Sequence, residues 1–182
     1  MKPLLLIDID GPLNPYAALV RPELPDGYAM HLTRPPGWDH GPPLPVLLNP
    51  EHGRALIGLS GRYDLVWATT WMDEANRWIG PRLGLPALPY IDWLSTRAGA
   101  WLSSGPDDAP ADTYWKTPCI VEYAAGRPFA WIDDEIAERD RDWIRGQRSA
   151  ALLLWVDPGT GLLPDHFETL AAWADGLRGG AR

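Results

Sequence analysis

The chain has 182 residues, a length that fits one domain with a sizeable core. Hydrophobic residues make up 46% and charged residues 22%, as in ordinary globular proteins, and no apolar run reaches the ~18 residues that a transmembrane helix needs. The formal net charge of −8 argues against strong non-specific binding of nucleic acid, which requires a basic face.

The start of the chain does not have the pattern of a signal peptide. Its apolar run covers only Leu4–Ile7 and stops at Asp8, and no small-residue cleavage site follows. We therefore expect a cytoplasmic protein. The single cysteine, Cys119, cannot form an internal disulfide and is expected to be a small core residue.

Five short apolar runs predict strands. In chain order they are Leu4–Ile7, Leu65–Ala68, Leu88–Ile91, Phe129–Ile132 and Ala151–Val156. Each run is continuous rather than alternating, which is typical of strands buried on both faces of a parallel sheet.

Helical patterns lie between these runs. They predict helices over residues 51–59, 72–83, 117–125 and 136–145, and a last helix that begins at residue 164. Alternation of strand and helix predicts a doubly wound α/β domain with right-handed crossovers around a central parallel sheet of about five strands.

Two segments interrupt this alternation. Residues 12–50 are rich in proline, glycine and aromatic residues, and Tyr28–Leu32 and Val46–Leu48 are predicted to pair there as a hairpin. Residues 95–115 form a predicted loop rich in serine, glycine, proline and aspartate. Both segments are expected to border the carboxyl ends of the strands, where ligands bind in such sheets.

Asp8, Asp10 and Gly11 follow the first predicted strand. Alternate residues of a strand share a face, so the two carboxylates can point the same way. Carboxylates so close repel each other unless a cation lies with them. An ordinary turn at the end of a strand is the alternative explanation of an isolated Asp-x-Asp-Gly.

The second predicted strand ends near Thr69. Its hydroxyl, together with the N–H groups of Thr70 and Trp71 at the start of the next predicted helix, predicts an anion site. A plain helix cap is the simpler alternative.

Lys116 stands out because only two of the 16 cationic residues are lysines. It precedes a predicted helix start at Thr117, with Pro118 in the first turn. Lysine is a compact point charge, whereas arginine is a planar fork, so the choice of lysine here can be chemical. A solvated surface lysine is the alternative.

Asp133 and Asp134 follow another apolar run, Phe129–Ile132. One of them can cap the next helix. Capping alone does not explain two acidic strand ends at one edge of a parallel sheet, because so many carboxylates destabilise the fold unless a hard cation such as Mg²⁺ binds there.

The order of these four motifs resembles that of the haloacid dehalogenase-like (HAD) superfamily over residues 4–134. The motifs are Asp8-Ile9-Asp10-Gly11-Pro12-Leu13-Asn14-Pro15, Trp67-Ala68-Thr69-Thr70-Trp71, Lys116-Thr117-Pro118 and Trp131-Ile132-Asp133-Asp134-Glu135. They look especially like a small HAD group in predicted bacterial RNA-repair (Swiss Army Knife) proteins. The resemblance implies a Rossmannoid three-layer α/β/α domain over residues 1–182. It also implies a small cap or flap insertion at 14–50, and it makes 95–115 a loop insertion near the active site.

The resemblance further implies a Mg²⁺-dependent phosphatase that forms an aspartyl-phosphate. Asp8 would be the nucleophile and Asp10 the general acid and base. Thr69, or Thr70 if the strand end is displaced by one residue, would hold a phosphoryl oxygen. Lys116 would neutralise the charge of the nucleophile and of the transferring phosphoryl group.

The same resemblance implies that Mg²⁺ is held by Asp8, by the backbone carbonyl of Asp10 and by the pair Asp133 and Asp134. Asp134 is favoured as the direct ligand, with Asp133 oriented toward the lysine.

Further side chains are candidates for binding the substrate, and core or surface packing is the alternative for each. Trp71 can stack on a base, Arg77 can hold a second anion and Thr70 can hold an oxygen. The substrate can be a nucleic-acid end, as the finer resemblance suggests, or a small phosphorylated molecule, as the acidic charge suggests. A phosphotransferase and a non-catalytic module that binds a phosphorylated ligand are the other functions considered.

Overall fold

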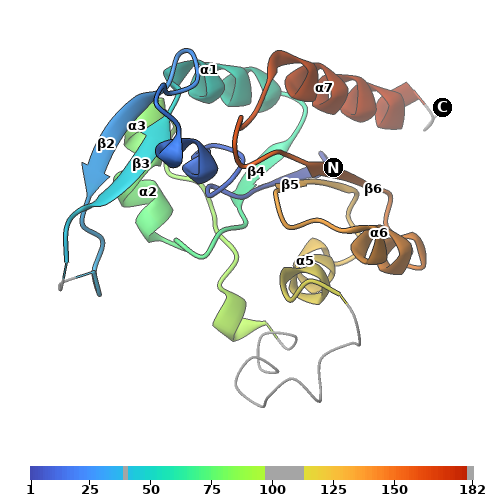
Figure 1. Ribbon diagram of the computed structural model, residues 1–182. Helices are drawn as coiled ribbons and strands as arrows, with labels where there is room; N and C mark the ends of the chain where they lie inside the picture. Colours follow the sequence, from blue (N-terminus) through green and yellow to red (C-terminus); the bar gives the residue numbers. More distant parts are fainter. Residues whose placement is uncertain (39–40, 97–112, 180–182) are drawn as a thin grey trace.

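The computed structural model describes residues 1–38, 41–96 and 113–179. Its central sheet has four parallel strands in the order β4-β1-β5-β6 (Figure 1). They are β1 (Leu4–Ile7), β4 (Asp64–Trp67), β5 (Phe129–Asp133) and β6 (Ala151–Trp155). Because β1 lies between β4 and β5, with Leu5 level with Leu65 and Ala130, the carboxyl ends of these three strands meet at one edge of the sheet.

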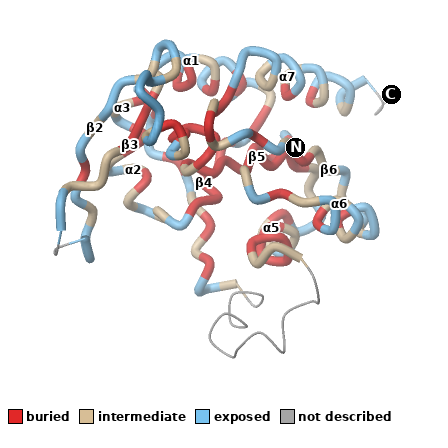
Figure 2. Tube along the Cα trace, in the orientation of Figure 1, coloured by how far each residue is buried: buried red, intermediate tan, exposed pale blue. Residues whose placement is uncertain are grey.

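Helices cover both faces of this sheet. α1 (Pro50–Leu59) and α7 (Pro164–Gly179) lie on one face, and α5 (Lys116–Ala124) and α6 (Glu138–Arg145) lie on the other (Figure 1). The side chains of β1 alternate between two apolar clusters, so that the strand is buried throughout. Figure 2 shows the centre of the sheet as buried, whereas the edge strand β6 is only partly buried. The predicted three-layer α/β arrangement is confirmed.

The prediction of a strand at Leu88–Ile91 is wrong. The segment lies beside β4 through two backbone hydrogen bonds of 2.9 Å, in which Trp67 N donates to Pro89 O and Ile91 N donates to Trp67 O. Pro89 has no N–H group, so the ladder cannot continue along the segment. The described sheet therefore has four strands instead of about five.

The helix predicted over residues 72–83 is two short helices, α2 (Glu74–Trp78) and α3 (Gly80–Leu83). Pro81 has no N–H group to donate to the carbonyl four residues earlier, so one continuous helix cannot form, and the break falls at Ile79. The remaining long helices begin within two residues of their predicted starts. No helix in the described ranges has the length and apolar character needed to cross a membrane.

The predicted hairpin is present and slightly longer than expected. β2 (Ala29–Thr33) pairs antiparallel with β3 (Leu44–Leu48), and short 3₁₀ helices occur at η1 (Tyr16–Val20) and η2 (Trp93–Ser95). Val46 and Leu48 of β3 join the apolar cluster beneath α1. Most of the predicted loop at 95–115 lies outside the described residues.

Candidate active site

The loop after β1 places Asp8 and Asp10 in different surroundings. Asp8 is buried, and its Oδ1 accepts a hydrogen bond of 2.8 Å from the N–H of Ile9. Asp10 is half-buried, and its two oxygens accept from Asn14 Nδ2 at 2.7 Å and Trp71 Nε1 at 2.9 Å. The two carboxylates therefore have separate partners and are suited to separate tasks.

Lys116 is the first residue of α5, and its side chain is only 2% exposed. Its Nζ donates to Asp8 Oδ2 at 2.7 Å and to Asp133 Oδ2 at 2.8 Å. Three aromatic rings, those of Trp93, Tyr114 and Trp115, lie 5.7–6.0 Å from Nζ and keep water away from it. The alternative of a solvated surface lysine is wrong.

Burial and charge shift the pKa values in this site. Burial raises the pKa of Asp8 to about 8; Lys116 opposes this rise and Asp133 adds to it. Burial alone lowers the pKa of Lys116, but the two carboxylates outweigh it, and the net shift is upward. Burial also raises the pKa of Asp134 to about 6. The three carboxyl groups of Asp8, Asp133 and Asp134 outnumber the one ammonium group beside them, so their full ionisation would require a further cation.

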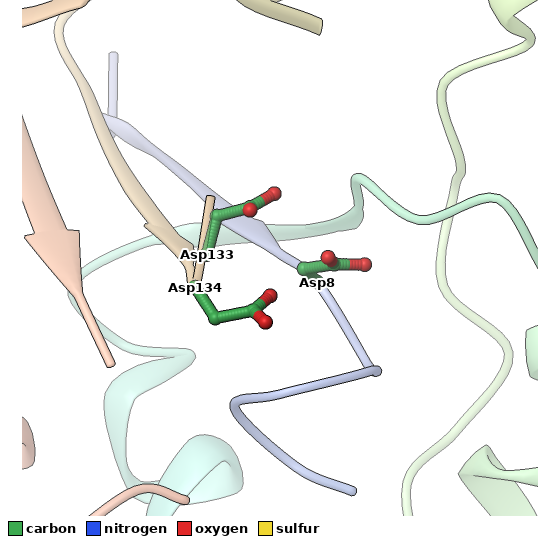
Figure 3. Close-up of side chains that lie close together, drawn as sticks. All are labelled: Asp8, Asp133 and Asp134. Carbon is green, nitrogen blue, oxygen red and sulfur yellow. The ribbon is translucent and has the colours of Figure 1, made fainter. Parts of the chain in front are cut away.

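Asp8, Asp133 and Asp134 bring one carboxylate oxygen each to within 4.8 Å of the others. Figure 3 shows the three side chains extending together from the ends of β1 and β5. Mg²⁺ binds preferentially to oxygen ligands, and a divalent cation would compensate the ionisation of three adjacent carboxyl groups. The three residues therefore fit the predicted metal, whereas the Asp10 side chain lies with Asn14 and Trp71.

Gly11 allows the loop after β1 to lie against Asp134. Its φ angle is +89°, and an added Cβ would lie only 2.4 Å from Asp134 Cγ. A residue with a side chain would be strained here and would push Asp134 away. The glycine is therefore required by the acidic cluster as well as by the turn.

Asp133 and Asp134 have different hydrogen-bond partners. Asp133 Oδ2 accepts a hydrogen bond from Lys116, and its Oδ1 accepts one of 2.9 Å from the N–H of Glu135. Asp133 therefore faces the lysine, as expected. Asp134 Oδ2 accepts from Tyr16 Oη at 3.0 Å. Burial, together with the hydrogen bond to Asp134, raises the pKa of Tyr16 to about 12, so its hydroxyl stays a donor near neutral pH. These contacts favour Asp134 as the direct metal ligand.

Thr69 is buried two residues beyond the end of β4, and its Oγ1 accepts a long hydrogen bond of 3.4 Å from the N–H of Trp71. The prediction that Thr70 and Trp71 open the next helix is wrong, because residues 70–73 form turns and α2 begins only at Glu74. Met72 has a left-handed φ of 49° there, which interrupts helical geometry. The N–H groups of Thr70 and Trp71 therefore do not lie at the helix N-terminus that was predicted for the anion site.

The three predicted substrate-binding residues have different positions. Thr70 and Trp71 line a cleft of about 310 Å³ together with Asp10. Arg77 lies on α2, where its exposed guanidinium pairs with Glu74 at 3.7 Å, and it does not line this cleft. The structure thus brings two of the three candidates to Asp10.

Sequence reasoning missed several residues that hold the site together. Asn14 bridges Asp10 and β3, because its Oδ1 accepts the N–H of Leu47 at 2.9 Å. Asn14 follows Asp10 by four residues, with Gly11 and Pro12 between them. This spacing could have predicted a turn that brings the Asn14 side chain back to Asp10. Asp140, which is fully buried, accepts from Thr117 Oγ1 at 2.7 Å and from the N–H of Ala137 at 2.9 Å. Of these two hydrogen bonds, only the one between Ala137 and Asp140 can be predicted from local sequence, because an acidic residue at position N3 of a helix commonly caps its start.

Comparisons of the chain with protein-family models, curated proteins and solved structures found no match. The fold that the structure establishes is an α/β fold with a four-stranded parallel sheet.

Proposed function

We propose that the protein is a HAD-like, Mg²⁺-dependent phosphomonoester hydrolase that works through an aspartyl-phosphate on Asp8. The observation that carries the proposal is the buried ammonium of Lys116, hydrogen-bonded to both Asp8 and Asp133 beside Asp134. A lysine so placed can neutralise charge on a nucleophile and on a phosphoryl group at once.

In the first step, an oxygen of Asp8 attacks phosphorus, and the bond between phosphorus and the ester oxygen breaks. Asp10 gives its proton to the departing oxygen, which leaves as an alcohol. Asp8 is suited to attack because it lies at the end of β1 with its carboxylate fixed by Ile9 and Lys116. Asp10 is suited to proton transfer because it is only half-buried and lines the cleft.

In the second step, a water oxygen attacks phosphorus as the Asp10 carboxylate accepts the proton of that water. The bond between phosphorus and Asp8 breaks, which releases phosphate and restores the Asp8 carboxylate. The Lys116 ammonium offsets the charge of the phosphoryl group through both steps. Thr69, buried at the end of β4, is the proposed ligand of a phosphoryl oxygen.

Asp8 and Asp134, together with the backbone carbonyl of Asp10, would hold the metal. When bound, Mg²⁺ supplies charge neutralisation for the phosphate as it approaches an acidic protein. Asp133 keeps Lys116 in place through its own hydrogen bond.

The test is hydrolysis of a panel of phosphomonoesters, with Mg²⁺ and with EDTA. We expect phosphate release that depends on Mg²⁺ and falls by at least about 10³-fold in Asp8→Asn, because the nucleophile is lost. Asp165→Asn, at an exposed position on α7, is the matched control and should keep full activity. Activity that is equal in Asp8→Asn and wild type would contradict the proposal, as would inactivity of the wild type toward the whole panel.

A phosphotransferase would use the same Asp8 chemistry. An added alcohol distinguishes the two, because a transferase passes the phosphoryl group to the alcohol, whereas a hydrolase releases inorganic phosphate. We propose hydrolysis because Asp10 is only half-buried, so water can reach it and give up a proton to it.

A further inference from the structure

Asp10 is held by hydrogen-bond donors from two different parts of the chain. Asn14 Nδ2 donates to Oδ1 at 2.7 Å, and Trp71 Nε1 donates to Oδ2 at 2.9 Å. Asn14 is itself held by the N–H of Leu47 in β3. The loop after β1 and the segment after β4 therefore meet at one carboxylate, and the hairpin is linked to it through Asn14. Each oxygen of Asp10 keeps a lone pair free for a proton.

The cleft beside Asp10 has the size of a small-molecule site. Its volume of about 310 Å³ lies at the lower end of the range for ligand pockets. The hairpin contributes Pro35, Pro36 and Leu44, the segment after β4 contributes Trp71, and α2 contributes Glu74. Proline rings, a leucine side chain and an indole ring provide an apolar surface, so the cleft suits a partly apolar group.

The charged side chains of the cleft have one sign. Asp10 and Glu74 line it, and no lysine or arginine among the described residues does so. Glu74 is fixed in place, since its Oε2 accepts from Trp78 Nε1 at 2.7 Å and its Oε1 lies 3.7 Å from Arg77. An anionic group entering the cleft would lose water beside the Glu74 carboxylate and the Asp10 carboxyl group without gaining a cation, which is unfavourable.

We propose that this cleft is the leaving-group subsite, that it takes the uncharged, partly apolar alcohol of a phosphomonoester, and that Trp71 positions Asp10 to protonate that alcohol. The inference rests on the proposed function and narrows its substrate class. It favours small neutral alcohols over nucleic-acid ends and over substrates with a second phosphate. Trp71 acts through Asp10, so it is a positioning residue.

The first test is Trp71→Phe, which keeps an aromatic ring but removes the N–H donor. Alkyl phosphates need protonation of the leaving oxygen, whereas p-nitrophenyl phosphate has a leaving group that departs without it. We expect kcat/KM to fall by at least about 10-fold for an alkyl phosphate and by less than about 3-fold for p-nitrophenyl phosphate. If Trp71 had only a structural role, the substitution would lower kcat/KM for both substrates by the same factor. Trp143→Phe on α6 is the control and should not change the ratio.

The second test compares a simple alkyl phosphate with the same alkyl chain carrying a second phosphate, and with a 5′-phosphorylated oligonucleotide. We expect the neutral leaving group to be preferred by about 10-fold or more in kcat/KM, a discrimination of the size that like charges produce. Glu74→Gln removes the negative charge of Glu74 from the cleft and should reduce the preference for the neutral leaving group.

The outcomes separate the inference from the function on which it rests. If the wild type hydrolyses no phosphomonoester, both fail. If it hydrolyses them, but Trp71→Phe lowers alkyl and aryl phosphates equally, or the second phosphate or the oligonucleotide is preferred, only the inference is overturned.

Discussion

The ammonium group of Lys116 lies between Asp8 and Asp133, within 2.7 Å and 2.8 Å of one oxygen of each. It joins the first turn of α5 to the ends of two neighbouring strands in a place that water barely reaches. A buried charge is tolerated only when its partners compensate its lost hydration, so the three groups depend on one another.

Lys116→Met should destabilise the fold, because it leaves the buried carboxyl groups of Asp8 and Asp133 without their charged hydrogen-bond donor. We expect the free energy of unfolding, measured by urea titration, to fall by about 3 kcal/mol or more. The matched control is Lys2→Met, which changes the other lysine of the chain at an exposed position and should cost less than about 0.5 kcal/mol. Equal losses for the two variants would show that Lys116 is not the centre of a buried charge cluster.

Gly11→Ala should disturb both the turn and the acidic cluster. The alanine would need a φ of +89° and would press its Cβ against Asp134, so we expect a loss of about 2 kcal/mol and weaker Mg²⁺ binding. Gly58→Ala, in a helical position with open space around the added Cβ, should instead raise stability by up to about 1 kcal/mol. The close approach of Gly11 to Asp134 would be refuted if both substitutions proved neutral or stabilising.

Mg²⁺ should stabilise the folded chain, because the folded state alone brings Asp8, Asp133 and Asp134 together. Thermal unfolding should shift to higher temperature as Mg²⁺ is added, and EDTA should reverse the shift. Asp134→Asn should abolish most of this response, whereas Asp165→Asn should keep it. A response that survives in Asp134→Asn would place the ion elsewhere.

His52 should make the protein sensitive to acid. Burial, between the rings of Tyr28 and Phe167, lowers the pKa of its imidazole to about 4. As pH falls below the ordinary value of 6.5, the unfolded chain takes up a proton that the folded chain refuses, so stability is lost between about pH 6.5 and about pH 4.

The measurement is the free energy of unfolding at pH 7 and pH 4 for the wild type and His52→Phe. Between pH 7 and pH 4, we expect the free energy of unfolding to fall by about 2 kcal/mol less in His52→Phe than in the wild type. A similar fall in both proteins would argue against a neutral, buried His52. His166→Phe, at a less buried position, is the control and should change the acid-induced loss less.

Much of the architecture follows from local patterns in the sequence. Leu4–Ile7 and Phe129–Ile132 are apolar on both faces, and residues directly after parallel strands meet at one edge, so Asp8 and Asp133 were expected together. The errors have local causes as well. Pro81 and Pro89 each lack a backbone N–H group. The apolar residues around them nevertheless fit the pattern of a continuous helix and of a strand, and the predictions followed that pattern.

Other features of the site depend on contacts between distant segments. Trp71 reaches Asp10 across 61 residues of sequence, and Lys116 reaches Asp8 across 108. Neither helical nor strand periodicity encodes which donor meets which carboxylate. The rarity of lysine drew attention to Lys116, whereas Trp71, one of 11 tryptophans, carried no comparable signal for its contact with Asp10.

The most direct test of the central claim is detection of a phosphoryl group on Asp8. Asp10→Asn, given p-nitrophenyl phosphate and Mg²⁺, should form the aspartyl-phosphate and hydrolyse it slowly, because the leaving group needs no acid but the water needs a base. After acid quenching, peptide mass spectrometry should find one hydroxylamine-sensitive phosphoryl group, on Asp8. Phosphate release without any label on Asp8, or a label on another residue, would contradict the account.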